Sequence, residues 1–274
     1  MSNPLLKYYR QPKIYLSLPS GGNYWPPGAL NGDPSNLPVF GMTAMDEIMF
    51  KTPDALFSGE AIASVIKSCI PEIIDPWSIP GIDIDSILVA IRIATYGQMM
   101  PASFKCQNCQ EENKFDLDLS KTLDYFSSIE YKDKVIAGPL VISIRPLNYK
   151  EQTHVAMKTY ELRRKIVQNV DGMPEKEKAK MINNTINEIA TVQVEGFQRC
   201  IVSIEVENES VDDPVMINEF IKNSDREIFD KLKTHMEGLT EIWKIQSQKT
   251  VCAECEHENK VNIGLDNSDF FGRN

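Results

Sequence analysis

Two short cysteine pairs, far apart in the sequence, constrain this chain more than any other feature. The pairs are Cys106-Gln-Asn-Cys109 and Cys252-Ala-Glu-Cys255. Two-residue spacing lets both thiolates of a pair bind one small ion, and four thiolates from two such turns form a closed tetrahedral zinc site. We therefore predict a structural Zn²⁺ ion bound by Cys106, Cys109, Cys252 and Cys255.

The residues that follow the two pairs also match. The first pair opens CQNCQEENKFDLDL and the second opens CAECEHENKVNIGL, so both read Cys-x-x-Cys-x-x-Glu-Asn-Lys. Apolar residues then alternate with polar ones, at Phe115, Leu117 and Leu119 and at Val261, Ile263 and Leu265. Alternation of this kind is typical of a half-buried strand. We expect two knuckles, each followed by a strand, that form a pseudo-symmetric zinc ribbon with four cysteine ligands.

Other uses of the cysteines stay open. The pairs could form two local disulfides, or one pair could be a redox centre. A redox motif usually opens a helix beside a strand, whereas each pair here precedes a predicted strand. His257 follows Cys255 by two residues and is a further candidate ligand, although the first knuckle has no matching histidine. Cys69 and Cys200 lie in apolar helical patterns, which favours buried, unreactive thiols.

Composition places the chain among ordinary globular proteins. Of its 274 residues, 42% are hydrophobic and 25% are charged, which is the usual balance of such proteins. No run reaches the eighteen apolar residues that indicate a membrane helix, and the N-terminus lacks the apolar core of a secretory signal. We therefore expect a protein that is made and kept in a cytoplasm.

The charge balance is acidic, with a formal net charge of −10 and a pI near 4.9. Glutamates flank both knuckles, at Glu111, Glu112, Glu254, Glu256 and Glu258. Because nucleic-acid binding needs a basic face that displaces counterions, this pattern disfavours it. A nucleic-acid-binding viral regulator built on a zinc ribbon remains the alternative interpretation.

Periodicity predicts a mainly helical α+β fold with a strand at 140–145. Helices are expected at about 43–51, 59–70, 83–96, 148–168 and 174–194 (continuing to about 204), at 214–222, and from 224 toward the second knuckle. We divide the chain into an extended, aromatic, Pro- and Gly-rich arm (1–41), a helical domain (42–100), the zinc ribbon (101–119 plus 248–266), a mainly helical insertion (120–247) and a C-terminal tail (267–274).

Local signals support some of these boundaries. Thr43-Ala-Met-Asp46 and Asn148-Tyr-Lys-Glu151 both read as capping sequences at helix starts. Gly97 is a predicted helix cap. The acidic stretch 205–213 is expected to be a solvated loop. The aromatic arm should lie against the body of the protein or against a neighbouring molecule.

Signatures of catalysis are absent from the sequence. His154 and His235 lie in helical patterns without a nucleophile signature beside them. The sequence contains no Walker loop, no dinucleotide glycine pattern, no HExxH and no G-x-S-x-G. A zinc ion held by four cysteines also lacks an open position for water. We predict a protein that is not an enzyme.

Two blocks of residues 14–119 resemble a known family. One block is Leu18-Pro-Ser-Gly-Gly22 followed by aromatic residues, and the other begins at Met42-Thr-Ala-Met-Asp-Glu47. The second block continues through Pro53, Leu56, Ser58-Gly59, Ala61-Ile62, Ile66–Ile70 and Ala90–Gly97 to the first knuckle. In this order the blocks resemble the T4-type bacteriophage baseplate proteins that take part in assembling the central hub of a contractile tail.

This resemblance implies a structural component or assembly factor of the tail that works without catalysis. Its partners would be other baseplate hub proteins, together with tube or tape-measure proteins. It would occupy the host cytoplasm during assembly and, if retained, the baseplate of the virion. It implies neither nucleic-acid binding nor a membrane span.

Overall fold

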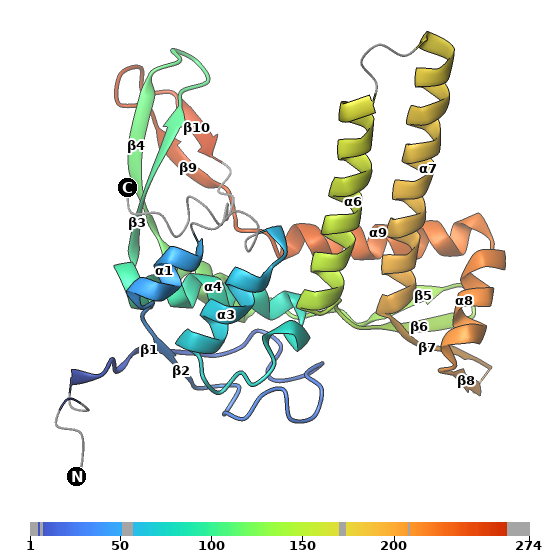
Figure 1. Ribbon diagram of the computed structural model, residues 1–274, viewed down its shortest axis with the longest axis horizontal. Helices are drawn as coiled ribbons and strands as arrows, with labels where there is room; N and C mark the ends of the chain where they lie inside the picture. Colours follow the sequence, from blue (N-terminus) through green and yellow to red (C-terminus); the bar gives the residue numbers. More distant parts are fainter. Residues whose placement is uncertain (1–4, 6–7, 51–56, 170–173, 208, 262–274) are drawn as a thin grey trace. The chain divides into compact units, whose positions relative to one another are not determined.

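The computed structural model describes residues 5, 8–50, 57–169, 174–207 and 209–261 (Figure 1). The fold is α+β, with about half of the chain in helices and the strands in small antiparallel sheets. Two compact units make up the chain: unit 1 is Met1–Glu130 with Trp243–Asn274, and unit 2 is Tyr131–Ile242. Unit 2 is thus inserted in the sequence between two segments of unit 1. Among the described helices, none combines the length and apolar character needed to cross a membrane.

The N-terminal arm belongs to unit 1 and contributes buried side chains to it. Strands β1 (Pro12–Leu16) and β2 (Leu37–Phe40) pair antiparallel, and apolar side chains of the arm, among them Leu16 and Val39, are buried. The guanidinium of Arg10 donates to the carbonyl oxygens of Gly41 (2.8 Å) and Ser68. These buried side chains lie against the body of the protein, one of the two placements that the sequence left open, whereas Tyr8, Tyr9 and Tyr15 are largely exposed.

Three helices in the described part of unit 1 follow the sequence periodicity closely: α1 (Ala44–Phe50), α3 (Glu60–Cys69) and α4 (Gly81–Tyr96). The short 3₁₀ helix η2 (Pro76–Ser78) and helix α5 (Leu119–Ser128) also belong to this unit. Helix α4 is the core helix, with eleven of its sixteen residues buried. It ends at Tyr96 and is capped by Gly97, whose φ of +94° suits a residue without a Cβ. Thr43 and Asp46 cap α1 as predicted, because each accepts a hydrogen bond from the backbone N–H of the other.

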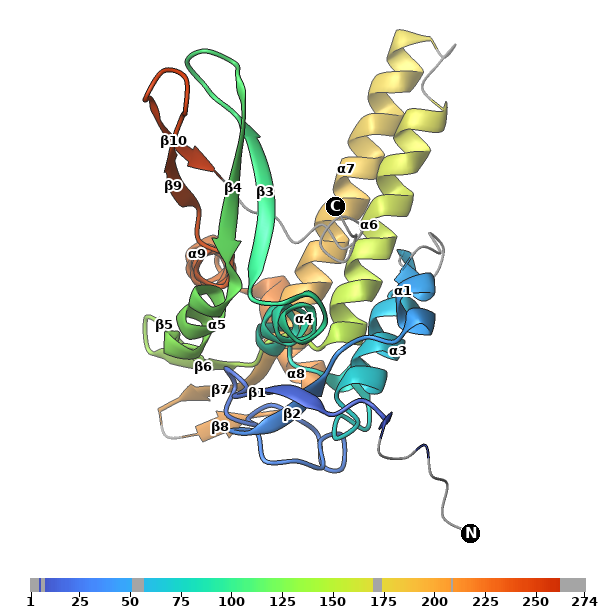
Figure 2. The ribbon, with the colours of Figure 1, turned by 90° about the vertical axis from the view of Figure 1, so that its left-hand side faces the viewer.

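Two hairpins extend from unit 1 and lie side by side in Figures 1 and 2. In the first, β3 (Met99–Lys105) pairs with β4 (Glu112–Asp118). In the second, β9 (Gln248–Val251) pairs with β10 (Glu258–Val261). The sequence predicted the strand after each knuckle and missed the strand before it, because β3 contains a proline and β9 is largely polar. Ile263, Leu265 and the predicted tail at 267–274 lie outside the described residues.

Unit 2 is built on a four-stranded antiparallel sheet of order β5-β6-β7-β8. Its strands are Lys134–Ala137, Leu140–Ile144, Ile201–Val206 and Glu209–Val211. Helices α8 (Pro214–Asn223) and α9 (Arg226–Ile242) contribute to the same core. Ile142 and Ile204 from the sheet and Leu232 from α9 are among its buried side chains.

Two predictions for this region were wrong. The helix expected to continue to about residue 204 ends at Cys200, where α7 (Glu175–Cys200) gives way directly to β7. The acidic stretch expected to be a loop is largely a β7–β8 hairpin, in which Glu205 pairs with Ser210. Pairing of β7 with β6 overrides the local helical pattern, since it buries Ile201 and Ile204 in the sheet core.

Helices α6 (Tyr149–Asn169) and α7, both predicted from the sequence, form an antiparallel pair (Figures 1 and 2). The capping sequence at the start of α6 is confirmed: the backbone N–H of Glu151 donates to Asn148 Oδ1 and that of Asn148 to Glu151 Oε2, both at 2.9 Å. Between these helices the sequence Asp171-Gly172 predicts a turn, and it lies outside the described residues.

Candidate metal centre

The first knuckle is the tight turn that joins β3 to β4. The backbone N–H of Cys106 donates to the carbonyl oxygen of Glu111 at 2.9 Å, and the N–H of Gln110 donates back to the carbonyl oxygen of Cys106 at 3.0 Å. Gln110 has a φ of +62°, in the left-handed region. This turn places Cys106 and Cys109 on one side of the hairpin tip.

The second knuckle, between β9 and β10, repeats this geometry. The N–H of Cys252 donates to the carbonyl oxygen of His257 at 3.0 Å, and the N–H of Glu256 donates to the carbonyl oxygen of Cys252 at 3.1 Å. Glu256 has a φ of +56°. The two knuckles share the same pair of backbone hydrogen bonds and a left-handed residue at the same position. The sequence repeat is therefore also a structural repeat.

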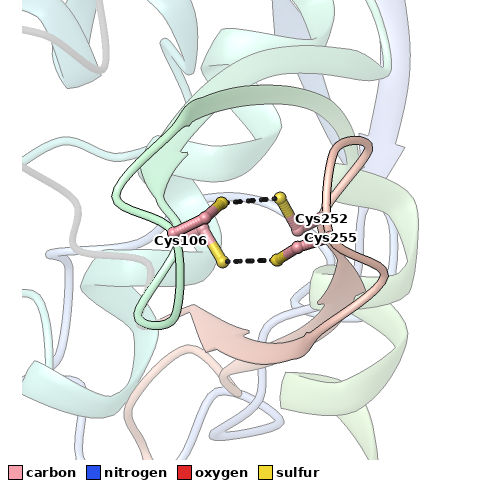
Figure 3. A group of neighbouring side chains, drawn as sticks. Cys106, Cys252 and Cys255 are labelled. Atoms are coloured by element: carbon pink, nitrogen blue, oxygen red, sulfur yellow. Dashed lines mark hydrogen bonds between the residues drawn. The ribbon is translucent and has the colours of Figure 1, made fainter.

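The two tips bring all four cysteine sulfur atoms together, within 4.8 Å of one another. Cys106 Sγ lies 3.6 Å from Cys255 Sγ, and Cys109 Sγ lies 3.6 Å from Cys252 Sγ, so both contacts join opposite knuckles (Figure 3). Metal–thiolate bonds of about 2.3 Å give a tetrahedron whose sulfur–sulfur edges are about 3.8 Å. The four sulfur atoms are therefore close to a tetrahedral ligand set and could hold a metal ion.

Hydrogen bonds favour the thiolate form of the first cysteine in each pair. The backbone N–H of Cys109 donates to the sulfur of Cys106 and, together with the amide of Asn259, lowers the Cys106 pKa to about 6 against the opposing effect of burial. The pKa of Cys252 is lowered in the same way, first by the backbone N–H of Cys255. Cys106 and Cys252 are also buried, with 0% and 1% of their surface exposed.

Crowding of sulfur atoms acts in the other direction. The backbone N–H of Glu111 lowers the pKa of Cys109, but burial and the three neighbouring sulfur atoms outweigh it and raise that pKa to about 12. Four thiolates at this distance repel one another, and a divalent cation would allow all four to ionise together. The donor set is thus suited to a soft, divalent metal.

Two asparagines complete the contacts around the sulfur atoms. Asn113 and Asn259 occupy the same position of the sequence repeat, four residues after the second cysteine of each pair. Each lies within hydrogen-bonding distance of a cysteine of the other hairpin, because Asn113 Nδ2 is 3.4 Å from Cys252 Sγ and Asn259 Nδ2 is 3.5 Å from Cys106 Sγ. The sequence analysis noted the repeated Glu-Asn-Lys without assigning a role to the asparagine.

The other histidine and cysteine residues singled out from the sequence lie outside this cluster. His257 has an exposed side chain, and its backbone carbonyl oxygen accepts a hydrogen bond in the second knuckle. Cys69 and Cys200 are buried, and burial raises the pKa of each to about 12, as expected for unreactive thiols. His235 Nε2 lies 2.9 Å from the carbonyl oxygen of Lys132.

Comparison with known proteins identifies a family. A family model described as T4 bacteriophage base plate protein matches residues 42–272. The match includes both knuckles and all of unit 2, whereas the resemblance drawn from the sequence covered only residues 14–119. It leaves out the Leu18–Gly22 block, on which part of that resemblance rested. Neither the curated proteins nor the solved structures include a match.

Proposed function

The chain belongs to the T4 bacteriophage base plate protein family, and from that premise we propose that it is a structural or assembly component of the central hub of a contractile-tail baseplate. Membership of this family implies a component of the phage tail that contacts other tail proteins. The match over residues 42–272 carries the proposal, because it covers all of unit 2, both knuckles and unit 1 from residue 42 onward. The hub position, the absence of catalysis and the specific partners are proposals.

The metal site in this proposal is a structural zinc ribbon. Cys106, Cys109, Cys252 and Cys255 supply the four thiolates, and the 3.6 Å contacts between opposite knuckles support a tetrahedral geometry. An ion bound by four thiolates has no position left for water or substrate, so it would stabilise the fold without catalysing a reaction. Its effect would be to fasten the second segment of unit 1 to the first.

The hollows found in the described surface do not support an enzymatic function. Two of them lie along the α6–α7 hairpin, where side chains such as Lys165, Glu188 and Thr191 line them. No histidine or cysteine is among the lining residues of these two hollows. We propose that the protein works through its surfaces, in contact with hub, tube or tape-measure proteins, in the host cytoplasm during assembly and in the baseplate where it is retained.

Affinity capture from infected cells tests this function. The tagged protein is recovered during tail assembly and its partners are identified by mass spectrometry, with the tagged Cys252→Ser variant and an untagged infection as controls. We expect hub, tube or tape-measure proteins with the parent and fewer of them with the variant. Recovery of polymerase subunits or nucleic acid in place of tail proteins would contradict the proposal.

The alternative, a nucleic-acid-binding regulator, rests on the pair of cysteine-tipped hairpins. The surface near those cysteines argues against it, because five glutamates that flank the knuckles are exposed: Glu111, Glu112, Glu254, Glu256 and Glu258. A phosphate backbone would be repelled there. Filter binding at low salt, where such an interaction is strongest, decides between the two functions.

A further inference from the structure

The two buried asparagines of the metal centre are unusual residues for a hairpin strand. Only 7% of the surface of Asn113 and 2% of that of Asn259 is exposed. A buried amide is costly unless its oxygen and both N–H groups are hydrogen-bonded. The partners of each amide therefore indicate why an asparagine occupies the position.

The amide of Asn113 connects its own hairpin to the other one. Its Nδ2 donates to the carbonyl oxygen of Glu111 at 3.0 Å, within the first knuckle. Its Oδ1 accepts the backbone N–H of Ala253 at 2.9 Å, and its Nδ2 lies 3.4 Å from Cys252 Sγ. Both of these contacts cross to the second knuckle, about 140 residues away in the sequence.

The amide of Asn259 makes the same contacts in the opposite direction. Its Nδ2 donates to the carbonyl oxygen of His257 at 2.9 Å, within the second knuckle. Its Oδ1 accepts the backbone N–H of Gln107 at 2.9 Å, and its Nδ2 lies 3.5 Å from Cys106 Sγ. Each hairpin thus contributes an amide to the first cysteine of its partner.

This arrangement gives the oxygen and both N–H groups of each amide a partner and fixes the orientation of the amide. The oxygen faces a backbone N–H, and the two N–H groups face a carbonyl oxygen and a sulfur atom. An aspartate in either position would keep the acceptor, lose both donors and add a negative charge beside the thiolates. Groups that hydrogen-bond to metal ligands orient those ligands, and their loss typically weakens metal binding 10–100-fold.

We propose that Asn113 and Asn259 are crossed positioning residues of the metal site: each holds the first cysteine of the opposite hairpin in its ligating orientation. The inference rests on the proposed metal site. It adds that the ligand set is complete only when the two hairpins are docked on each other, because neither hairpin orients its own first cysteine fully. Metal binding would then report whether the two sequence segments of unit 1 are joined.

Residue-by-residue alkylation of the full-length protein tests whether each asparagine positions the first cysteine of the opposite hairpin. The parent, Asn113→Ala and Asn259→Ala are loaded with Zn²⁺ and treated with a thiol-alkylating reagent, and the modified cysteines are identified by mass spectrometry. We expect Cys252 to react ahead of Cys106 in Asn113→Ala, and Cys106 ahead of Cys252 in Asn259→Ala. Faster reaction of the cysteines in the mutated hairpin itself would overturn the crossed assignment.

Affinity measurements provide the second readout. Competition with a chromophoric chelator should show Zn²⁺ binding 10–100-fold weaker in each variant, and the thiolate-to-metal absorption of the Co²⁺-loaded forms should shift. Asn108→Ala is the matched control, since it removes an exposed amide from the first knuckle and should leave both readouts unchanged. Asn113→Asp, which keeps the acceptor, serves as the second variant if Asn113→Ala does not fold.

The outcomes separate this inference from the proposed metal site. A parent protein that binds neither Zn²⁺ nor Co²⁺ would refute the metal site, and alkylation of the metal-free proteins would still decide the crossing. A parent that binds Zn²⁺ tightly while both alanine variants bind within twofold of it would overturn the positioning role and leave the metal site standing.

Discussion

Two parts of unit 1 are held together by opposite means. Among the residues of β3, β4, β9 and β10, the buried ones are Asn113, Leu117 and Asn259, and two of these three are amides. Helix α4, by contrast, buries eleven of its sixteen residues, most of them apolar. The hairpin pair therefore gains little from apolar burial, whereas α4 and the segments around it form an ordinary hydrophobic core.

This difference indicates where a metal ion matters. In the hairpin pair, sulfur–sulfur contacts and amide hydrogen bonds join the two halves. Removing an ion from such a site removes the main attraction between the halves, because structural metal binding contributes directly to folding. The α4 core should not respond to the ion. Four predictions test this contrast, from the largest expected effect to the smallest.

The largest effect is expected from Cys252→Ser. Structural zinc sites contribute on the order of 10 kcal/mol of binding free energy, so the variant should lose its bound metal and much of the protection of β9 and β10. Metal content by elemental analysis and amide hydrogen exchange measure the two effects. Cys69→Ala, which alters a buried cysteine of α3, should retain the metal. An unchanged melting temperature in Cys252→Ser, with no metal in the parent, would refute the contrast.

A cavity in α4 should have the complementary effect. Ile87 is fully buried, and Ile87→Ala should lower the free energy of unfolding by about 2–5 kcal/mol through lost burial and the cavity left behind. Metal content should stay at the parent level. Urea unfolding together with elemental analysis checks both statements. Ile48→Ala, at a position that is 57% exposed, is the control and should cost far less. Loss of metal in Ile87→Ala would show that the hairpins depend on the core after all.

The cluster of four cysteines was the part of the molecule that the sequence indicated most clearly. Each knuckle is a short local motif, and its repeat can be recognised in the sequence without knowledge of the fold. The contacts of Asn113 and Asn259 with the opposite hairpin could not be predicted from the sequence, because each amide meets these partners about 140 or 150 residues away in the chain. Local sequence predicts the ligands of such a site more readily than the residues that orient them.

The same reasoning explains which elements were predicted. Capping and periodicity are local signals, so helices α1, α4 and α6 were found close to their observed bounds. Strand β7 was missed because its stability depends on pairing with β6, which brings Ile142 next to Ile204. The β3 and β9 strands depend on hairpin pairing in the same way. Elements defined by distant partners escape a local analysis.

A buried carboxylate makes the α4 core sensitive to pH. Burial raises the pKa of Asp83 to about 6 from 3.8, although hydrogen bonds from Ser20 and Trp25 oppose the shift. Since the folded-state pKa is the higher one, the contribution of Asp83 to stability is fully present below pH 3.8 and is lost as the pH rises through about 6. The unfolding free energy from this group should therefore fall by about 3 kcal/mol between those values.

Urea unfolding between about pH 4 and 7 measures this contribution, with Asp83→Asn as the variant that cannot titrate at this position. The difference between parent and variant should change with pH in the stated direction, and an NMR titration of the parent gives the carboxyl pKa directly. A carboxyl pKa below about 4 would mean that the three hydrogen bonds outweigh burial, and that α4 carries an ionised group at all pH values tested.

The smallest effect is expected at the start of α1, which belongs to the packed part of unit 1. The hydroxyl of Thr43 accepts the backbone N–H of Asp46 at 3.2 Å, and loss of such a cap costs about 1 kcal/mol. Thr43→Ala should show this decrease in urea unfolding with no change in metal content, whereas Thr43→Ser keeps the hydroxyl and should resemble the parent. Equal stability of all three proteins would mean that neighbouring contacts hold α1 in place without the cap. A fall in metal content would mean that even this small loss reaches the hairpins, and that the two parts of unit 1 are coupled.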